Sequence, residues 1–512
     1  MVGSRHVGVR VVLLAFLFLS IRIRTNPAQD YDSLTPEIPK TWDEEALRTM
    51  ELPMTDPAAS PKYISADYYY RMPVRPVYKT YPVYSPKQEP SGYLDRLKAQ
   101  EPKILFDATK LKSKEDWIHA GELVFQAPIE FVDSTEALYS LIRTVDWFEK
   151  NGVRTTKDGI FPNFRYVVRE KGKVELGILS CAHCHTRVMP DGTTLLGAQG
   201  NFPDDRAFGY ETGLEAKKSE HAEKDLSDMR DFMRRNYAAP WIANDINAQP
   251  ASMSLEDIVS ALEAIPPGVC ARQGSSVFSP ARIPDLIGVK DHRYLDASGR
   301  VQHRSIGDLM RYAALNQGAD LLSTYGTFKP KGELRDPSTH SRYSDEQLYA
   351  LALYVYSLKP PPNPNPSDAS AARGKMVFEH SGCTVCHPGP LYTNNELTPV
   401  EGFEVPSNHV KTYDILNMTV DTDSTLTLKT RRGSGYYKVP SLMGLWYRGP
   451  LEHNGSVATL EDWFDPRRIQ DDYVPTGFRG YGIKTRAVKG HTFGLSLSAE
   501  ERKDLIAFLK TL

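Results

Sequence analysis

The sequence predicts a mainly α-helical protein made of two related units in tandem, preceded by an extended arm rich in proline and tyrosine. Two observations lead to this prediction. The string Cys-x-x-Cys-His occurs twice in the 512-residue chain. The segments around the two strings also resemble each other in the same order, and in both cases the last of them has helical periodicity. Hydrophobic residues make up 40% of the chain, which suffices for a globular core of two or three domains.

The two strings, at residues 181–185 and 383–387, use four of the five cysteines. This pattern is typical of covalent c-type haem attachment, in which two thiols bond the porphyrin and the following histidine binds the iron. Zinc half-sites or a redox dithiol would explain the cysteine pairs but not a histidine in the same place twice. We therefore expect two covalently bound haem c groups. Their predicted covalent sites are Cys181 and Cys184, and Cys383 and Cys386; their predicted iron ligands are His185 and His387.

An internal repeat defines the two units. Residues 120–125, Ala-Gly-Glu-Leu-Val-Phe, match residues 373–378, Arg-Gly-Lys-Met-Val-Phe, each ahead of a Cys-x-x-Cys-His string. Residues 283–288 and 439–444 then share an x-Pro-x-Leu-x-Gly pattern that is typical of a turn. Each unit is expected to open with a helix, carry one haem motif, pass this turn and end on a helix. That order is typical of a c-type cytochrome domain.

The closing segments, residues 344–358 and 498–512, are predicted to be helices. Ser498 with Glu501 three residues later has the pattern of a capping box, and Ser344 occupies the same position in the other segment. Apolar residues recur at helical spacing in both segments.

These features give the predicted domain organisation. The first cytochrome domain carries long loop insertions on both sides of its haem motif, which would form either a substrate pocket or packing surface. A proline-rich linker separates it from the second domain. The boundaries are 1–25 for a signal peptide or anchor, 26–104 for the arm, 105–360 for the first domain and 367–512 for the second.

The arm is expected to lack helices. Its prolines favour extended, polyproline-like backbone, and its many tyrosines favour an arm laid over the folded part of the chain rather than a free tether.

Residues 1–24 are typical of an export signal. Arg5 and Arg10 precede an apolar run at 11–21 that is short for a membrane span. No clear cleavage site follows, so removal of the segment and its retention as an anchor both stay open. Because haem c is attached on the exported side of the bacterial membrane, we expect a periplasmic or secreted protein that contacts the membrane only through this segment. The formal net charge of -2 gives no sign of nucleic-acid binding.

A family resemblance appears in the second unit. The run Lys-Val-Pro-Ser-Leu-Met-Gly-Leu-Trp at 438–446, followed by Pro-Leu-Glu-His-Asn-Gly-Ser-Val-Ala-Thr-Leu-Glu-Asp at 450–462, resembles di-haem cytochrome c peroxidases and their MauG-like relatives. The resemblance covers 367–512 well and 115–360 more weakly, and it implies a di-haem oxidoreductase. Met443 stands where the family usually has arginine, and no methionine follows it. The late axial methionine of the peroxidases therefore cannot be carried over.

Gly-His-Thr-Phe-Gly at 490–494 is instead similar to the rubber-oxygenase branch of the same superfamily. In that branch the second haem carries a late histidine, while the first has no strong distal ligand and activates O2. We therefore expect His491 as the sixth ligand of the second haem, with Met418 as the alternative. In the repeat, His491 corresponds to Pro337, which cannot bind iron, and the nearest histidine is His340. The first haem is thus expected to be open, and its catalytic residues are unknown.

Three functions fit these patterns. The first is an enzyme in which one haem reacts with peroxide or O2 while the other relays electrons. The second is a non-catalytic electron carrier, and the third is a subunit of a periplasmic redox assembly that docks through the arm. The insertions favour the enzyme, whereas the lack of a recognisable distal acid or histidine near the first motif favours the carrier. A small electron-donor or acceptor protein is the expected partner.

Overall fold

The computed structural model describes residues 36–512 except 273 and 335. The predicted export signal lies outside the described residues. Residues Ile38–Leu512 form one compact unit, and the elements below all belong to it. Within the described part of the chain, no helix is both long enough and apolar enough to cross a membrane.

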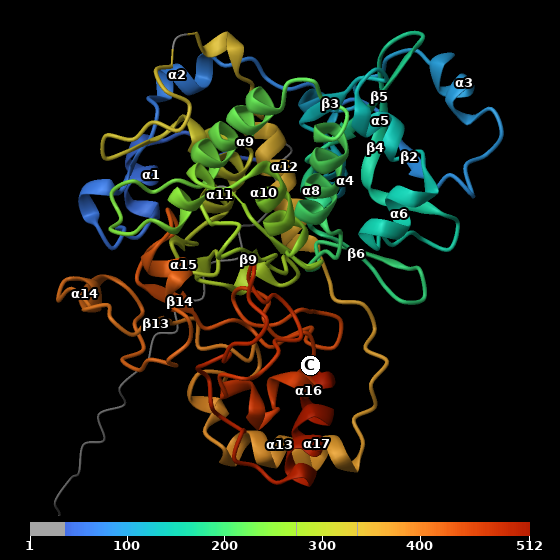
Figure 1. The fold of residues 1–512 in the computed structure, drawn as a ribbon. Helices are drawn as coiled ribbons and strands as arrows, with labels where there is room; N and C mark the ends of the chain where they lie inside the picture. Colours follow the sequence, from blue (N-terminus) through green and yellow to red (C-terminus); the bar gives the residue numbers. More distant parts are fainter. Residues whose placement is uncertain (1–35, 273, 335) are drawn as a thin grey trace, which may run out of the picture. The chain divides into compact units, whose positions relative to one another are not determined.

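Two crossed helix pairs repeat in the structure and confirm the predicted opening and closing helices of each half (Figure 1). Both predicted caps are present: Ser344 and Ser498 each form a capping box at the start of the closing helix. The first pair is α4 (Lys114–Gln126) with α12 (Asp345–Ser357), and the second is α13 (Ala369–His380) with α17 (Ala499–Lys510).

A glycine lies at each helix crossing. A Cβ atom on Gly121 of α4 would lie 1.9 Å from the carbonyl oxygen of Ala350, and one on Gly374 of α13 would lie 1.9 Å from that of Asp504. In the sequence repeat, Gly121 corresponds to Gly374 and Ala350 corresponds to Asp504. No side chain fits at such a distance, so the backbones of both pairs are in direct contact through equivalent glycines.

An aromatic contact completes each crossing. The rings of Phe125 and Tyr354 lie 5.2 Å apart, and those of Phe378 and Phe508 lie 5.3 Å apart, measured between centroids. Both pairs are tilted, at 55° and 58° between the ring planes. The two crossings therefore repeat in side-chain packing as well as in backbone path.

The prediction that prolines exclude helix from residues 26–104 is wrong. Three short helices form there because they fall between the prolines. One begins after the capping residue Ser65 and ends at Arg71, and its C-cap Met72 directly precedes Pro73, where a helix normally stops. The elements of this segment are α1 (Glu44–Met50), β1 (Pro61–Lys62), α2 (Ala66–Arg71), β2 (Thr80–Tyr84) and α3 (Tyr93–Lys98).

Aromatic and aliphatic residues of this N-terminal segment are part of the main core. Trp42 and Tyr69 are both 1% exposed and stack with ring centroids 4.2 Å apart. Trp42 also donates a hydrogen bond from Nε1 to the Ile64 carbonyl oxygen (2.8 Å). Together with Leu47 they pack in the same cluster as residues of α4 and α12.

The insertion ahead of the first motif folds around a four-stranded antiparallel sheet of order β2-β4-β5-β3. Its longest strand, β4, is buried on both faces and contains Pro162. The sequence does not predict this sheet, because a proline inside a run and the absence of alternation both argue against a strand. The elements of the insertion are β3 (Glu130–Val132), α5 (Ala137–Leu141), α6 (Val145–Asn151), β4 (Ile160–Glu170) and β5 (Lys173–Ile178).

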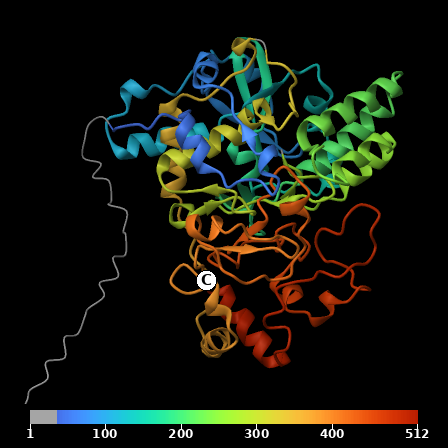
Figure 2. The ribbon, with the colours of Figure 1, turned by 90° about the vertical axis from the view of Figure 1, so that its left-hand side faces the viewer.

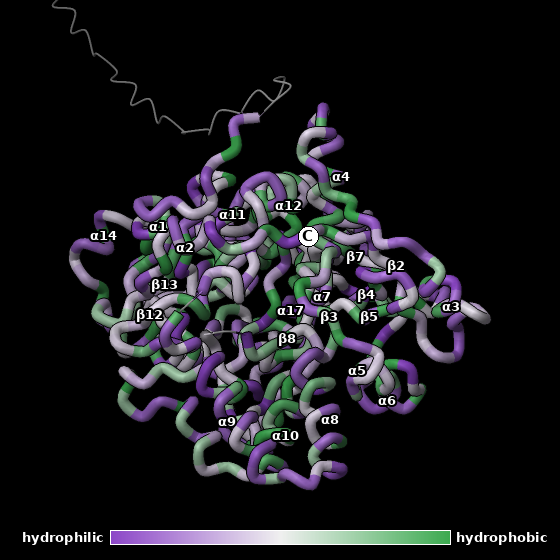
Figure 3. The backbone as a smooth tube through the Cα atoms, turned by 90° about the horizontal axis from the view of Figure 1, so that it is seen from above, coloured by the Kyte–Doolittle hydropathy of each residue, from purple (hydrophilic) through white to green (hydrophobic). Residues whose placement is uncertain are grey.

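Three helices fill the stretch between the first motif and its turn, and Figure 2 shows them grouped at one side of the unit in green. The third helix packs on the first, with Ile258 and Leu262 in the same hydrophobic cluster as Phe208. Figure 3 colours part of the third helix as hydrophobic. These helices are α8 (Asp204–Ala216), α9 (Ala222–Tyr237) and α10 (Leu255–Glu263).

The remaining elements are short. The helices are α7 (Cys181–Cys184), α11 (Ile306–Asn316), α14 (His409–Thr412), α15 (Thr425–Leu428) and α16 (Leu460–Trp463). The two-stranded sheets pair β1 with β12 (Thr324–Tyr325), β6 (Thr186–Val188) with β7 (Thr194–Leu196), β8 (Val269–Cys270) with β9 (Ala281–Arg282), β10 (Tyr294–Leu295) with β11 (Val301–Gln302), and β13 (Leu397–Pro399) with β14 (Tyr436–Lys438).

The helix crossing yields a stability prediction. Gly374→Ala places a methyl group against the Asp504 carbonyl, so it should destabilise the protein by about 1–3 kcal/mol, the usual range for overpacking. Gly213→Ala in α8 is the matched control, because its new Cβ meets only Val259 Cγ1, at 3.3 Å. Alanine has a higher helix propensity than glycine, so the stability of this variant should be unchanged or higher. Urea unfolding of both variants measures this difference. Equal stability of Gly374→Ala and the wild type would contradict the close crossing.

Candidate functional site

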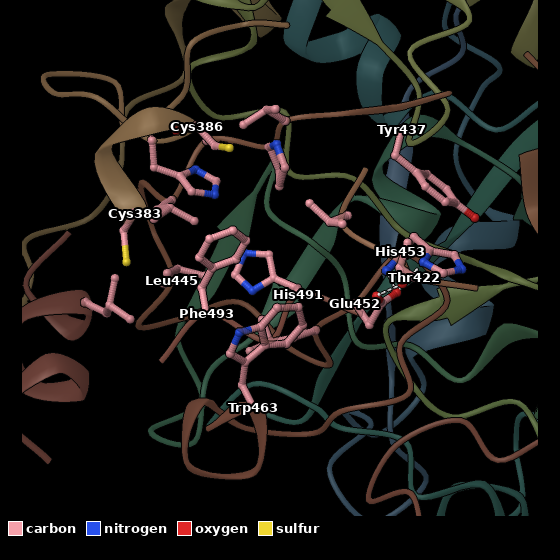
Figure 4. A pocket seen from close by; sticks show the side chains of 18 of the residues that line it. Cys383, Cys386, Thr422, Tyr437, Leu445, Glu452, His453, Trp463, His491 and Phe493 are labelled. Carbon is pink, nitrogen blue, oxygen red and sulfur yellow. Dashed lines mark hydrogen bonds and ion pairs between the residues drawn. The ribbon is translucent and has the colours of Figure 1, made fainter. Parts of the chain in front are cut away.

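The second Cys-x-x-Cys-His string and His491 converge on one cavity (Figure 4). Cys383, Cys386 and His387 line it from one side, where the short turn Cys383–Val385 follows α13. His491 lines it from the loop ahead of α17. The remaining wall is largely apolar and includes Leu442, Leu445, Leu451, Phe464, Leu505 and Leu509.

His387 and His491 face each other with ring centroids 6.4 Å apart. Two imidazoles bound to one metal from opposite sides, with metal–nitrogen distances of about 2.0–2.1 Å each, have centroids roughly 6 Å apart. His387 Nδ1 donates a hydrogen bond to the Tyr392 carbonyl oxygen (3.0 Å), which leaves Nε2 as the unprotonated nitrogen of the neutral ring. Burial lowers the pKa of His387 to about 4, so the ring is neutral at pH 7, as a metal ligand must be.

The backbone around His491 holds its side chain toward the cavity. His491 has a positive φ of 45°, its N–H donates to the Val420 carbonyl (2.6 Å), and its own carbonyl accepts from Arg468 Nη2 (2.7 Å). Gly490 precedes it at φ +84°, where a Cβ would lie 2.5 Å from Thr422 Cα. These main-chain contacts therefore fix the conformation of the loop and the direction of the His491 side chain.

The structure does not bring Met418 to this cavity. Met418 is half-exposed and is absent from the lining, and Met443 is 40% exposed. Of the two candidates from sequence, only His491 lies opposite His387. Ligation itself stays a prediction.

A polar group lies at the end of the cavity away from the cysteines, as Figure 4 shows. Glu452 pairs with His453 and accepts a hydrogen bond from the Thr422 hydroxyl (2.5 Å). His453 stacks on Tyr437 with ring centroids 4.4 Å apart. The pairing and the stacking fix both side chains, so this end of the cavity is rigid and polar.

The first motif lies on the short helix α7, capped by Ser180. His185 Nδ1 donates to the carbonyl oxygen of Pro284 (3.1 Å), the proline of the repeated turn. Burial lowers the pKa of His185 to about 4. His185 and His387 thus share the same protonation state and the same kind of backbone partner.

A larger cavity, of about 900 Å³ against about 200 Å³ for the second, lies beside the first motif. Cys184 and His183 line it, whereas Cys181 and His185 do not. Cys181 Sγ lies 3.7 Å from Gln317 Nε2, at the edge of the same lining. The lining includes residues from both insertions, so extra chain and open space coincide at the first motif, as a substrate pocket requires.

Acidic groups that the sequence analysis missed line this cavity. Glu211 accepts a hydrogen bond from Trp147 Nε1 (2.9 Å), and burial raises its pKa to about 8, so it holds a proton at pH 7. Asp204 pairs with His183 Nε2 at 2.7 Å. Asp204 and Glu211 are two turns apart on α8 and therefore share one face of the helix. The seven-residue spacing is visible in the sequence, but only the tertiary structure shows that this face of α8 lines the first cavity.

His340 also lines the first cavity, whereas Pro337 is buried in a short 3-10 turn. The position that matches His491 thus carries no ligand, but a histidine lies three residues further on. Cys270, the fifth cysteine, is 1% exposed and packs beside Cys184 and Ile283.

The comparisons with known proteins agree with the resemblance found in the sequence. The chain is 30% identical over 146 residues to cytochrome-c peroxidase IdrP2 of Denitromonas iodatirespirans. This alignment covers 26% of this chain and 36% of the relative. The chain is 29% identical over 164 residues to cytochrome-c peroxidase IdrP1 of the same organism, covering 28% and 40%. No family model matches. The chain resembles the di-haem cytochrome c peroxidase and MauG-like superfamily, and it spans about two fifths of the length of the curated relatives it matches.

Two solved structures are similar over part of the chain. One is a hydrazine synthase of Kuenenia stuttgartiensis, with a TM-score of 0.31 and 16% identity, covering 56% of this chain and 87% of that one. The other is a MauG-like protein associated with microbial copper homeostasis, with a TM-score of 0.28 and 18% identity, covering 45% and 73%. These scores are too low to define a shared fold.

Proposed function

We propose that this protein is an exported di-haem c-type oxidoreductase built from two tandem cytochrome domains, with one haem c on each Cys-x-x-Cys-His string. The convergence of the second string and His491 on one apolar cavity, with His387 and His491 at the separation of a bis-histidine site, carries the proposal. The relatives named cytochrome-c peroxidase support the same class of chemistry.

The residues of the second cavity fit a haem. Two thiols and a neutral histidine lie on one side, a second histidine lies opposite, and the wall between them is apolar. His387 and His491 would hold the iron from both sides and leave it no open position. This site would therefore relay electrons from a small donor protein rather than bind a substrate.

We place the reacting site at the first motif, with the larger cavity beside it. When bound there, a haem with an open iron position would supply the electron chemistry for peroxide or O2. His185 is held by Pro284, the larger cavity leaves room beside the motif, and Glu211 holds a proton inside that cavity. A buried acid that keeps its proton at neutral pH suits a reaction that converts peroxide to water.

One observation favours a non-catalytic electron carrier as the alternative. His340 lines the first cavity. A carrier would use this histidine as a sixth ligand, so that both irons would be closed to substrate.

The haem content gives the first test of this proposal. Intact-mass measurement after acid-acetone extraction should show the chain plus two haems, because thioether bonds survive this treatment. The double variant Cys383→Ala and Cys386→Ala should lose one haem, and Cys270→Ala should keep both. Binding of zinc in place of haem would sink the proposal.

The ligand of the second haem gives a separate test. His491→Ala should convert the low-spin signal of this haem to high-spin, since the other histidine of the lining, His453, is paired with Glu452 at the end of the cavity away from the cysteines. Met418→Ala is the matched control and should leave the signal unchanged. A near-infrared methionine-to-iron band in the wild type would reverse this assignment.

The first haem decides between enzyme and carrier. Electron paramagnetic resonance of the oxidised protein should show one high-spin signal that cyanide converts to low-spin, together with peroxide turnover. His340→Ala should leave that signal unchanged if the iron is open. Two low-spin signals that ignore cyanide, one of them lost in His340→Ala, would leave only the carrier.

A further inference from the structure

Three cationic side chains line the second cavity: Arg282, Lys438 and Arg448. They come from separate parts of the chain. Arg282 belongs to β9 in the first half, Lys438 ends β14, and Arg448 follows the repeated turn. Each is half-buried, and each takes part in the wall of a cavity that is otherwise largely apolar.

None of the three has a carboxylate partner among the described residues. Lys438 Nζ donates only to the Tyr294 carbonyl oxygen (3.3 Å), and Arg448 Nη2 donates to that of Ser441 (2.8 Å). Arg448 Nε is buried without a partner. The Arg282 guanidinium makes no hydrogen bond or ion pair within the part of the chain that the structure describes; only its backbone N–H is bonded, to the His453 carbonyl (2.8 Å).

The carboxylates nearby are engaged elsewhere. Each has other partners, so none neutralises the three cations by direct contact. Glu452 pairs with His453, Asp296 pairs with Arg432, and Asp285 accepts from the Tyr447 hydroxyl (2.8 Å) and the Ile287 N–H (3.0 Å).

The cations also repel one another. Burial, together with the charges of Arg282 and Arg448, lowers the pKa of Lys438 to about 8. Burial and the neighbouring Arg448 lower the pKa of Arg282 to about 10. A group of like charges with little solvent and no direct counter-ion is unfavourable by itself, so its presence indicates an anionic ligand.

We propose that Arg282, Lys438 and Arg448 form an anion site for the two propionates of the haem on the second Cys-x-x-Cys-His string. The inference rests on the proposed function and extends it to the opposite edge of the porphyrin. The thioether bonds fix the vinyl edge at Cys383 and Cys386, so the propionates must lie across the cavity. The backbone of Arg282 is bonded to His453, at the end of the cavity away from the cysteines in Figure 4.

The same segment reaches the first motif. Ile283, next to Arg282, packs against Cys184, and the Pro284 carbonyl accepts the hydrogen bond of His185. Residues 282–284 therefore lead from the wall of the second cavity to the first motif. In the proposed site, the segment Arg282-Ile283-Pro284 would connect the propionate edge of the second haem to His185, the proposed iron ligand of the first haem.

The reduction potential of the second haem tests the site in the holoprotein. Arg282→Gln, Lys438→Gln and Arg448→Gln should each make its reduction less favourable by about threefold to tenfold, where tenfold is 59 mV for one electron. Loss of a positive charge beside the propionates favours the more positive ferric state. Arg282→Lys keeps the charge and should retain the wild-type potential even if the neutral variant folds poorly. Arg230→Gln is the matched control, because Arg230 also binds main-chain carbonyls but lines none of the cavities described above.

The outcomes separate this inference from the proposed function. Intact mass with two haems and an unchanged potential in all three variants would overturn the anion site and leave the di-haem assignment standing. Absence of haem from the second motif would overturn both. If inorganic phosphate shifts the potential of the wild type but not of the variants, the cations bind a solution anion instead of the propionates, and the inference fails.

Discussion

The direct backbone contact between α13 and α17 positions the second cavity. Because Gly374 has no side chain, α13 packs against the Asp504 carbonyl of α17. The Cys-x-x-Cys-His string leaves the end of α13, and the His491 loop enters the start of α17. The crossing of the two helices therefore sets where both segments meet the cavity, and the bonds of His491 to Val420 and Arg468 then hold its loop opposite His387. The first half has the same contact at Gly121, so the helix pairs of the two halves cross in the same way.

Burial then decides the protonation of the groups at both motifs. The two motif histidines are neutral at pH 7 because burial lowers their pKa, while the hydrogen bond from each Nδ1–H to a main-chain carbonyl raises the pKa by less and fixes the tautomer. The same desolvation keeps a proton on Glu211 in the first cavity. Three cations in the wall of the second cavity have no direct counter-ion among the residues that the structure describes. The wall of the second cavity thus combines apolar side chains with a group of cations, which matches the haem and propionates proposed above.

The two halves share a helix frame but differ in what surrounds it. The second motif follows its helix after a short turn, and the cavity beside it is small and lined on one side by the His491 loop. The first motif is preceded by a four-stranded sheet and followed by three helices, and the cavity beside it is several times larger. The same motif can therefore serve two tasks. What differs is the chain added around it, which sets the space and the acidic groups near the motif.

The sequence by itself determined the two Cys-x-x-Cys-His strings, the repeat and the capped closing helices. It also favoured His491 over Met418 as the sixth ligand of the second haem. These features are local, because covalent attachment and capping depend on residues a few positions apart. Only the tertiary structure decided that the N-terminal segment contributes Trp42 and Tyr69 to the core, that β4 is a strand despite Pro162, and that Glu211 faces the first cavity. It also brought Arg282 of the first half beside Lys438 and Arg448 of the second. Such contacts join residues far apart in the chain, and their energy comes from burial and charge at the meeting point, which no local pattern records.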